Sequence, residues 1–187
     1  MVTFIPIDLN IHKPLLIELS EEYFSWIAYE MKKNYDLDIF NVESKIQSNN
    51  LEQKAFIRGY AKISVEQLTS YKPPEGIYYI IQINEKIAGM GALRKINNDI
   101  GEIKRMYIRE NYRGKGFGKK LFQKLLQKAR EFHFSTIRLE TGKFMIVAQH
   151  IYRKAGFREI DEYPEIETPP PLRPYWKYME KNLDKKL

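Results

Sequence analysis

The most informative segment of the chain reads Arg113-Gly114-Lys115-Gly116-Phe117-Gly118-Lys119. It lies between a predicted strand at residues 101–108 and a predicted helix at residues 119–132. Glycine permits positive φ angles, and the amide groups at a helix N-terminus attract anions such as phosphate. Two familiar phosphate loops are excluded, because a dinucleotide fingerprint requires glycine at position 119 and a P-loop requires Ser or Thr at position 120, and both are lysine. The segment therefore predicts an anion-binding turn of another kind.

The elements around this turn predict a mixed sheet flanked by helices. Upstream, residues 77–83 and 86–95 are β-branched or aromatic runs separated by Asn84 and Glu85, which predicts a hairpin, and residues 2–8 predict an earlier strand. Downstream, the pattern predicts strands at 136–140, 157–162 and 175–179 and a helix at 145–155. An antiparallel meander followed by alternating strands and helices belongs to class α+β or α/β.

The first third of the chain is predicted to be helical. Residues 14–33 have apolar positions at helical spacing, with acids early in the segment (Glu18, Glu21, Glu22) and lysines late (Lys32, Lys33), an arrangement that suits the helix dipole. Residues 41–70 predict one or two further helices, the last capped by Ser64 with Gln67 three residues later. The prolines of the turn at 72–76 end this region.

The charge of the chain is concentrated in one segment. The 187 residues include 31 Lys and Arg against 24 Asp and Glu, a net charge of +7. Residues 102–130 alone carry ten basic and two acidic side chains, a net +8, so the remainder sums to −1. This distribution favours one local anionic ligand over a general nucleic-acid surface, with a solvated helix face as the alternative.

Composition excludes several classes of protein. The chain has no cysteine, so disulfides, thiol nucleophiles and thiolate metal sites are excluded. The three histidines form no metal-ligand pattern, and no metal is expected. The N-terminus has no signal-peptide pattern and no apolar run approaches 18 residues, which leads us to expect a cytoplasmic protein without a membrane partner.

Two motifs together resemble the GNAT acetyltransferase superfamily. Arg113-x-x-Gly116-x-Gly118 is similar to that family's Arg/Gln-x-x-Gly-x-Gly/Ala pyrophosphate loop, and Tyr152-x-x-x-Gly156-Phe157 is similar to its helix-to-strand element. The resemblance covers roughly the last hundred residues. It implies a mostly antiparallel sheet of about seven strands, splayed between the fourth and fifth. It also implies one domain over residues 1–187, with an acceptor-side helical region at 14–71 and an acyl-CoA-binding core at 77–182.

The resemblance further implies that acetyl-CoA is the acyl donor and assigns residues to it. Main-chain groups of Met106, Tyr107 and Ile108 are expected to contact pantetheine. The pyrophosphate is expected at the loop formed by Arg113, Gly114, Lys115, Gly116, Phe117, Gly118 and Lys119. Gln149 and Tyr152 are expected to complete the cofactor site, and Lys119, Lys120 or Arg153 to meet the 3′-phosphate.

Two side chains are the predicted catalytic groups. By the resemblance, Tyr152 protonates the departing thiolate; the alternative is a packing role on its helix face. Glu102 lies eleven residues before Arg113, the spacing of the strand glutamate that serves as general base in histone-acetylating relatives. Its alternative is an exposed charge at a strand start, and Glu140 is the second candidate for the base.

The predicted function is therefore N-acetylation of a primary amine by direct transfer from acetyl-CoA in a ternary complex. The acceptor is a small molecule or a protein amine, and the protein is a possible homodimer. The alternative is a non-catalytic acyl-CoA-binding sensor. Nucleic-acid binding through the basic segment is the third hypothesis, which predicts a steep dependence on salt, and no nucleic-acid partner is expected.

Overall fold

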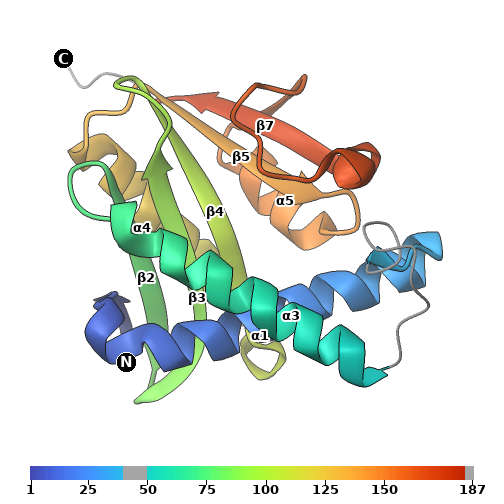
Figure 1. Ribbon diagram of the computed structural model, residues 1–187. Coiled ribbons are helices and arrows are strands. Elements are labelled where there is room, and N and C mark those ends of the chain that lie inside the picture. The colour runs from blue at the N-terminus through green and yellow to red at the C-terminus, as the bar shows by residue number, and fades with distance from the viewer. Residues whose placement is uncertain (40–49, 184–187) are drawn as a thin grey trace. The chain divides into compact units, whose positions relative to one another are not determined.

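The computed structural model describes residues 1–39 and 50–183 (Figure 1). The predicted helical residues 41–49 lie outside this range. The chain forms two compact units: a sheet unit of residues 1–7, 70–169 and 175–187, and a helical unit of residues 8–69 and 170–174.

The sheet unit contains one seven-stranded sheet with the order β1-β2-β3-β4-β5-β7-β6. The strands are β1 Val2–Pro6, β2 Gly76–Ile83, β3 Lys86–Lys95, β4 Ile100–Ile108, β5 Thr136–Gly142, β6 Arg158–Ile160 and β7 Trp176–Asn182. Neighbouring strands are antiparallel except β4 and β5, which are parallel. The predicted class and the mixed, mostly antiparallel sheet are confirmed.

Two helices of the sheet unit, α4 (Phe117–Glu131) and α5 (Ile146–Lys154), supply one side of its core. The buried face of α4 comprises Leu121, Phe122, Leu125, Leu126 and Ala129, at the spacing expected of an amphipathic helix. These residues pack with every second residue of the strands, such as Leu93, Ile103 and Leu139. Because side chains alternate across a strand, the neighbouring Arg94, Glu102 and Glu140 project from the other face of the sheet.

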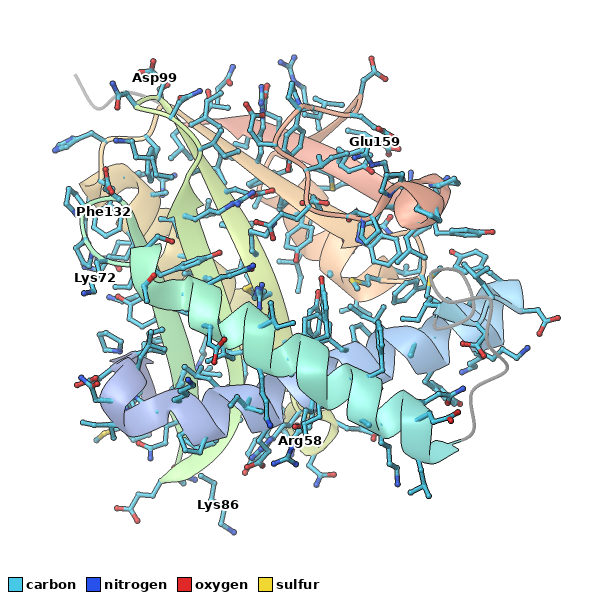
Figure 2. The ribbon with its side chains drawn as sticks, viewed as in Figure 1. Arg58, Lys72, Lys86, Asp99, Phe132 and Glu159 are labelled. Atoms are coloured by element: carbon cyan, nitrogen blue, oxygen red, sulfur yellow. The ribbon has the colours of Figure 1, made fainter. Side chains whose placement is uncertain are left out.

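The fourth and fifth strands separate after a short paired region. Ile100–Ile103 pair with Thr136–Leu139, and β4 then continues for five residues while β5 pairs only with β7 on its other side. Figure 1 shows the two strands starting side by side and then diverging. The Asp99 carbonyl accepts the Ser135 and Thr136 N–H groups (2.9 and 3.0 Å) and so fixes the paired end, opposite the Lys86 end of the β2–β3 hairpin (Figure 2).

A β-bulge lies where the separation begins. Met90 pairs with Tyr107 and Ala92 pairs with Lys104, so one residue of β3 faces two of β4. Arg105, one of these two, has φ +53°, a left-handed conformation that a non-glycine residue adopts at some cost. The extra residue bends β4 away from β5, as the resemblance implied.

The helical unit differs from the sequence prediction at both helices. Helix α1 spans Leu9–Tyr35 and begins five residues before the predicted start, because the Asp8 carboxylate accepts the Asn10 N–H as an N-cap. Pro14 is therefore inside the helix, and Glu18, Glu21 and Glu22 lie beyond the first turn, so the dipole argument fails for them.

Helix α3 spans Asn50–Glu66 and is followed by a 3-10 turn at Gln67–Ser70. The predicted cap at Ser64 is wrong, since Ser64 is buried within α3. The ion pairs Lys13–Glu66 and Glu21–Arg58 join α1 and α3 in opposite order along the two helices, which are therefore antiparallel.

Candidate active site

The glycine-rich loop is shaped for a ligand that approaches the main chain. Gly114 and Gly116 have φ values of +74° and +79°, and a Cβ added at either would meet nothing within 4 Å. Gly116 is the N-cap of α4, and no side chain caps that helix end. The first amide groups of an α-helix have no partner inside the helix, so this open N-terminus is a fitting site for an anion.

Arg113 fastens the loop to the end of β4. Its Nε donates to the Ile108 carbonyl at 2.8 Å, and its guanidinium lies 5.6 Å from the centre of the Tyr107 ring. The ammonium group of Lys115 donates to the Asn111 carbonyl at 2.9 Å. These two cations of the motif thus hold the loop in shape.

The last residues of β4 present one edge that no described strand pairs with. Arg109 donates its N–H to Ala88 of β3 at 2.8 Å, and because peptide groups alternate along a strand, those of Ile108 point away from β3. The Met106 side chain packs in the space left by Gly91, where an added Cβ would lie 2.8 Å from the Met106 sulfur. Pairing with β5 ends at Ile103, so this edge leads from the bulge directly to the loop.

Tyr152 and Gln149 lie on the buried face of α5. The Tyr152 ring is 6% exposed and packs 5.0 Å from the Phe122 ring and 6.2 Å from the Phe157 ring, between centroids. The Gln149 amide nitrogen donates to the carbonyls of Gly142 and Lys143, at 2.9 and 3.0 Å, and joins α5 to the end of β5. The expected contact between Gln149 and the cofactor stays a prediction. The structure shows the Gln149 side chain hydrogen-bonded to the main chain at the end of β5.

Glu102 is completely buried, so the alternative of an exposed charge at a strand start is wrong. Its Oε2 accepts Arg94 Nε at 2.6 Å and lies 3.4 Å from Lys104 Nζ, and its Oε1 accepts the Tyr163 hydroxyl at 2.6 Å. Burial raises the pKa of Glu102 above its ordinary value, although Lys104, Arg94 and the Tyr163 hydroxyl act against it. A carboxylate with a raised pKa is a stronger proton acceptor.

Glu140, the second candidate for the base, is held by a different set of donors. It accepts the N–H groups of Glu167 and Thr168, both at 3.0 Å, as well as the Thr168 hydroxyl, and it lies 3.2 Å from Lys104 Nζ. Burial favours a higher pKa, but Lys104 and these donors outweigh it and leave the pKa of Glu140 below its ordinary value. Glu140 therefore holds residues 167–168 against the sheet and is a poorer base than Glu102.

The charged cluster around Glu102 and Glu140 also contains four residues that the sequence did not identify, namely Arg94, Lys104, Tyr163 and Glu167. Arg94 joins Glu102 to Glu167 and donates to the Glu165 carbonyl at 3.0 Å, and Lys104 bridges three carboxylates. Burial lowers the pKa of Lys104, but those carboxylates outweigh it and raise the pKa above its ordinary value. Lys104 could have been suspected because it lies two residues after Glu102 on the same strand, whereas nothing in the sequence around Tyr163 marked it as a partner of Glu102.

The comparisons with known proteins identify the family. The family pattern described as "Acetyltransferase (GNAT) family" matches residues 39–157, well over half of the chain. This protein belongs to the GNAT acetyltransferase family. Among curated proteins, N-acetyltransferase YjgM of Escherichia coli K12 is 33% identical over 94 residues, 49% of this chain and 56% of that protein. N-acetylaspartate synthetase of Xenopus tropicalis is 34% identical over 90 residues, 48% of this chain and 33% of that protein.

The chain thus spans about half of the first relative and a third of the second. Among solved structures, PaiA N-acetyltransferase of Thermoplasma acidophilum in complex with coenzyme A is similar with a TM-score of 0.68 at 18% identity, covering 98% of this chain and 99% of that one. A GNAT acetyltransferase of Staphylococcus aureus Mu50 has a TM-score of 0.63 at 22% identity, covering 98% and 100%. At these identities the likeness shows the fold.

Residues 1–39 and 50–183 contain neither a cluster of metal ligands nor a helix able to cross a membrane. No group of three or more His, Asp or Glu side chains in these ranges has the arrangement of a metal site. None of the helices described in the structure is long and apolar enough to cross a membrane.

Proposed function

We propose that this protein is an N-acetyltransferase that transfers an acetyl group from acetyl-CoA directly to a primary amine. The observation that carries the proposal is the junction between the part of β4 beyond its pairing with β5 and the glycine-rich N-terminus of α4, which no side chain caps. An extended amide chain suits the strand edge, and a pyrophosphate suits the helix N-terminus. Acetyl-CoA has both parts in that order, so the residues present fit it.

The loop and strand have separate tasks in this proposal. The amides of residues 115–119 hold the pyrophosphate, and the main chain of residues 106–108 orients the pantetheine. The exposed Lys119 and Lys120, which follow Gly118, provide positive charge for the remaining phosphate. Bound acetyl-CoA supplies a thioester whose acyl carbon is open to attack by a free amine.

Tyr152 is the proposed proton donor for the departing thiolate. Its ring is held on two sides by Phe122 and Phe157, and a hydroxyl fixed in this way loses little freedom when it transfers a proton. The same packing also serves the core. A change that removes only the hydroxyl therefore separates the two roles.

Glu102 is the proposed acceptor of the amine proton. A lysine-like amine has a pKa of about 10.4, so presenting the free base at pH 7 costs about 4.6 kcal/mol. Glu102 is completely buried, and we infer that the proton reaches it through a water molecule. Its raised pKa supports this role.

A thiol-release assay with acetyl-CoA across a panel of amines tests the proposal. The panel contains aspartate, a polyamine, an aminoglycoside and a lysine-containing peptide. Amine-dependent release of thiol is expected with at least one acceptor, and Tyr152→Phe should lower kcat at saturating acetyl-CoA while leaving acetyl-CoA binding unchanged. Binding of acetyl-CoA without release by any amine would favour the sensor, and Tyr152→Phe with wild-type kcat would contradict the acid assignment.

A further inference from the structure

The Tyr163 side chain connects the loop between β6 and β7 to the buried carboxylate of Glu102. Its hydroxyl donates to Glu102 Oε1 at 2.6 Å from a position 61 residues away in sequence. The ring is 6% exposed, meets the Tyr178 ring edge-on at 5.9 Å and has the Arg138 guanidinium 4.9 Å from its centre. Rotation of the phenol is therefore restricted by both neighbours, and the hydroxyl is fixed where it meets Glu102.

The two oxygens of Glu102 are held by different kinds of group. Oε2 faces the cations Arg94 and Lys104, and Oε1 faces the neutral donor Tyr163. Cations on one oxygen alone leave the carboxyl plane able to turn about the last side-chain bond. A directional hydrogen bond on the other oxygen removes that freedom.

We propose that Tyr163 is a positioning residue, which fixes the carboxylate of Glu102 as the acceptor of the amine proton. The inference rests on the role given to Glu102 in the proposed function. Tyr163 acts through Glu102 and is not required to touch either substrate.

The charges around Glu102 determine the sign of the expected effect. The titratable groups around it come from three strands and one loop. Arg94 on β3, Lys104 on β4, Glu140 on β5 and Tyr163 in the loop act on Glu102 itself. Glu167 pairs with Arg94 and Lys104, and Arg138 on β5 lies over the Tyr163 ring. Burial raises the pKa of Glu102, and the Tyr163 hydrogen bond lowers it because it stabilises the ionised form. Loss of the hydroxyl should therefore raise the pKa of Glu102 further.

The Tyr163 hydroxyl remains protonated, and so remains a hydrogen-bond donor, over the pH range in which a glutamate titrates. Burial and the adjacent Glu102 carboxylate raise the pKa of its hydroxyl far above the ordinary value for tyrosine. A change in the pH dependence of the reaction on removal of the hydroxyl thus reports on Glu102 and not on titration of Tyr163.

The experiment compares Tyr163→Phe with the control Tyr178→Phe, which likewise removes one hydroxyl, from the neighbouring buried ring. The first readout is kcat against pH at saturating acetyl-CoA and a single amine, so that the titration of the amine is common to all variants. The second readout is a 13C NMR titration of protein labelled at the glutamate carboxyl carbon, with Glu102→Gln identifying the Glu102 resonance. This readout does not depend on turnover.

A base must be ionised to act, so a higher pKa moves the acid limb of kcat to higher pH. For Tyr163→Phe we expect this limb and the NMR midpoint of Glu102 to rise together by about one to two pH units, and the rate below the limb to fall by about 10- to 100-fold. Raising the pH should restore the rate, a recovery that a merely structural defect would not show. Tyr178→Phe should match the wild type in both readouts.

The outcomes separate this inference from the proposed function. If Glu102→Gln loses the acid limb while Tyr163→Phe titrates like the wild type, Glu102 is the base and the positioning role of Tyr163 is wrong. If Glu102→Gln keeps the wild-type profile, the base assignment itself fails and the inference fails with it. If Tyr163→Phe and Tyr178→Phe lose activity equally without a shift in pH, the effect is one of packing and overturns the positioning role.

Discussion

Replacement of Gly116 by alanine tests whether the loop conformation creates the proposed pyrophosphate site. Gly116 has φ +79° and ψ 2°, and an added Cβ would meet no atom within 4 Å, so strain in the main chain is the only local effect. A left-handed conformation costs a non-glycine residue about 1–2 kcal/mol. If the loop keeps its shape, the variant should melt about 2–8 °C lower. If the loop relaxes to negative φ, the amides turn away and the affinity for coenzyme A should fall about 5- to 30-fold.

Gly118→Ala is the matched control, two residues further along. Gly118 lies in the first turn of α4 with an ordinary helical φ, and its added Cβ would meet Ile108 Cγ1 at 3.7 Å, a normal contact. Alanine is favoured over glycine in a helix by about 1 kcal/mol, so this variant should bind coenzyme A like the wild type and melt no lower. Isothermal titration calorimetry at fixed salt and thermal denaturation measure both quantities. Wild-type affinity together with a wild-type melting temperature in Gly116→Ala would refute the reasoning.

Three further variants test other parts of the protein, two of them in the sheet unit and one in the helical unit. Gly89→Ala would place a Cβ 2.1 Å from the Tyr107 carbonyl oxygen, and because both groups belong to paired strands, we expect a loss of about 3 kcal/mol in urea denaturation. In the control Gly59→Ala in α3, the added Cβ would meet nothing within 4 Å, so we expect the folded protein to be stabilised by up to about 1 kcal/mol. An unchanged urea midpoint for Gly89→Ala would contradict the close approach of Gly89 to Tyr107. In Glu140→Gln, a side-chain NH2 group replaces one carboxylate oxygen and faces the N–H groups of residues 167–168 and the Lys104 ammonium, which are themselves donors. This should lower the free energy of unfolding by about 1–3 kcal/mol at neutral pH. Since the folded pKa of Glu140 is depressed, its contribution is present above the ordinary glutamate pKa near 4.5 and is lost as pH falls through the folded value. The stability of Glu140→Gln should consequently depend less on pH than that of the wild type below pH 4.5, and equal acid slopes would show that Glu140 is not depressed.

Local patterns were sufficient to predict most elements of the sheet unit. Helix α4 and the β2–β3 hairpin lie within two residues of their predicted bounds, because the helix has apolar residues at helical spacing and the two strands are apolar runs separated by a two-residue turn. The helical unit was predicted less well. An N-cap carboxylate at Asp8 starts α1 early enough to include Pro14, and burial of Ser64 overrides its tendency to cap a helix.

Sequence by itself determined the glycine-rich turn that we propose binds an anion, since glycine spacing and the start of a helix are local properties that seven residues carry. Only the tertiary structure decided the surroundings of Glu102. Its partners Arg94 and Tyr163 come from another strand and a distant loop, and no local pattern specifies which charges the pairing of strands will bring together. Burial then changes their chemistry, because a carboxylate removed from water depends on those partners for its charge, its orientation and its affinity for a proton.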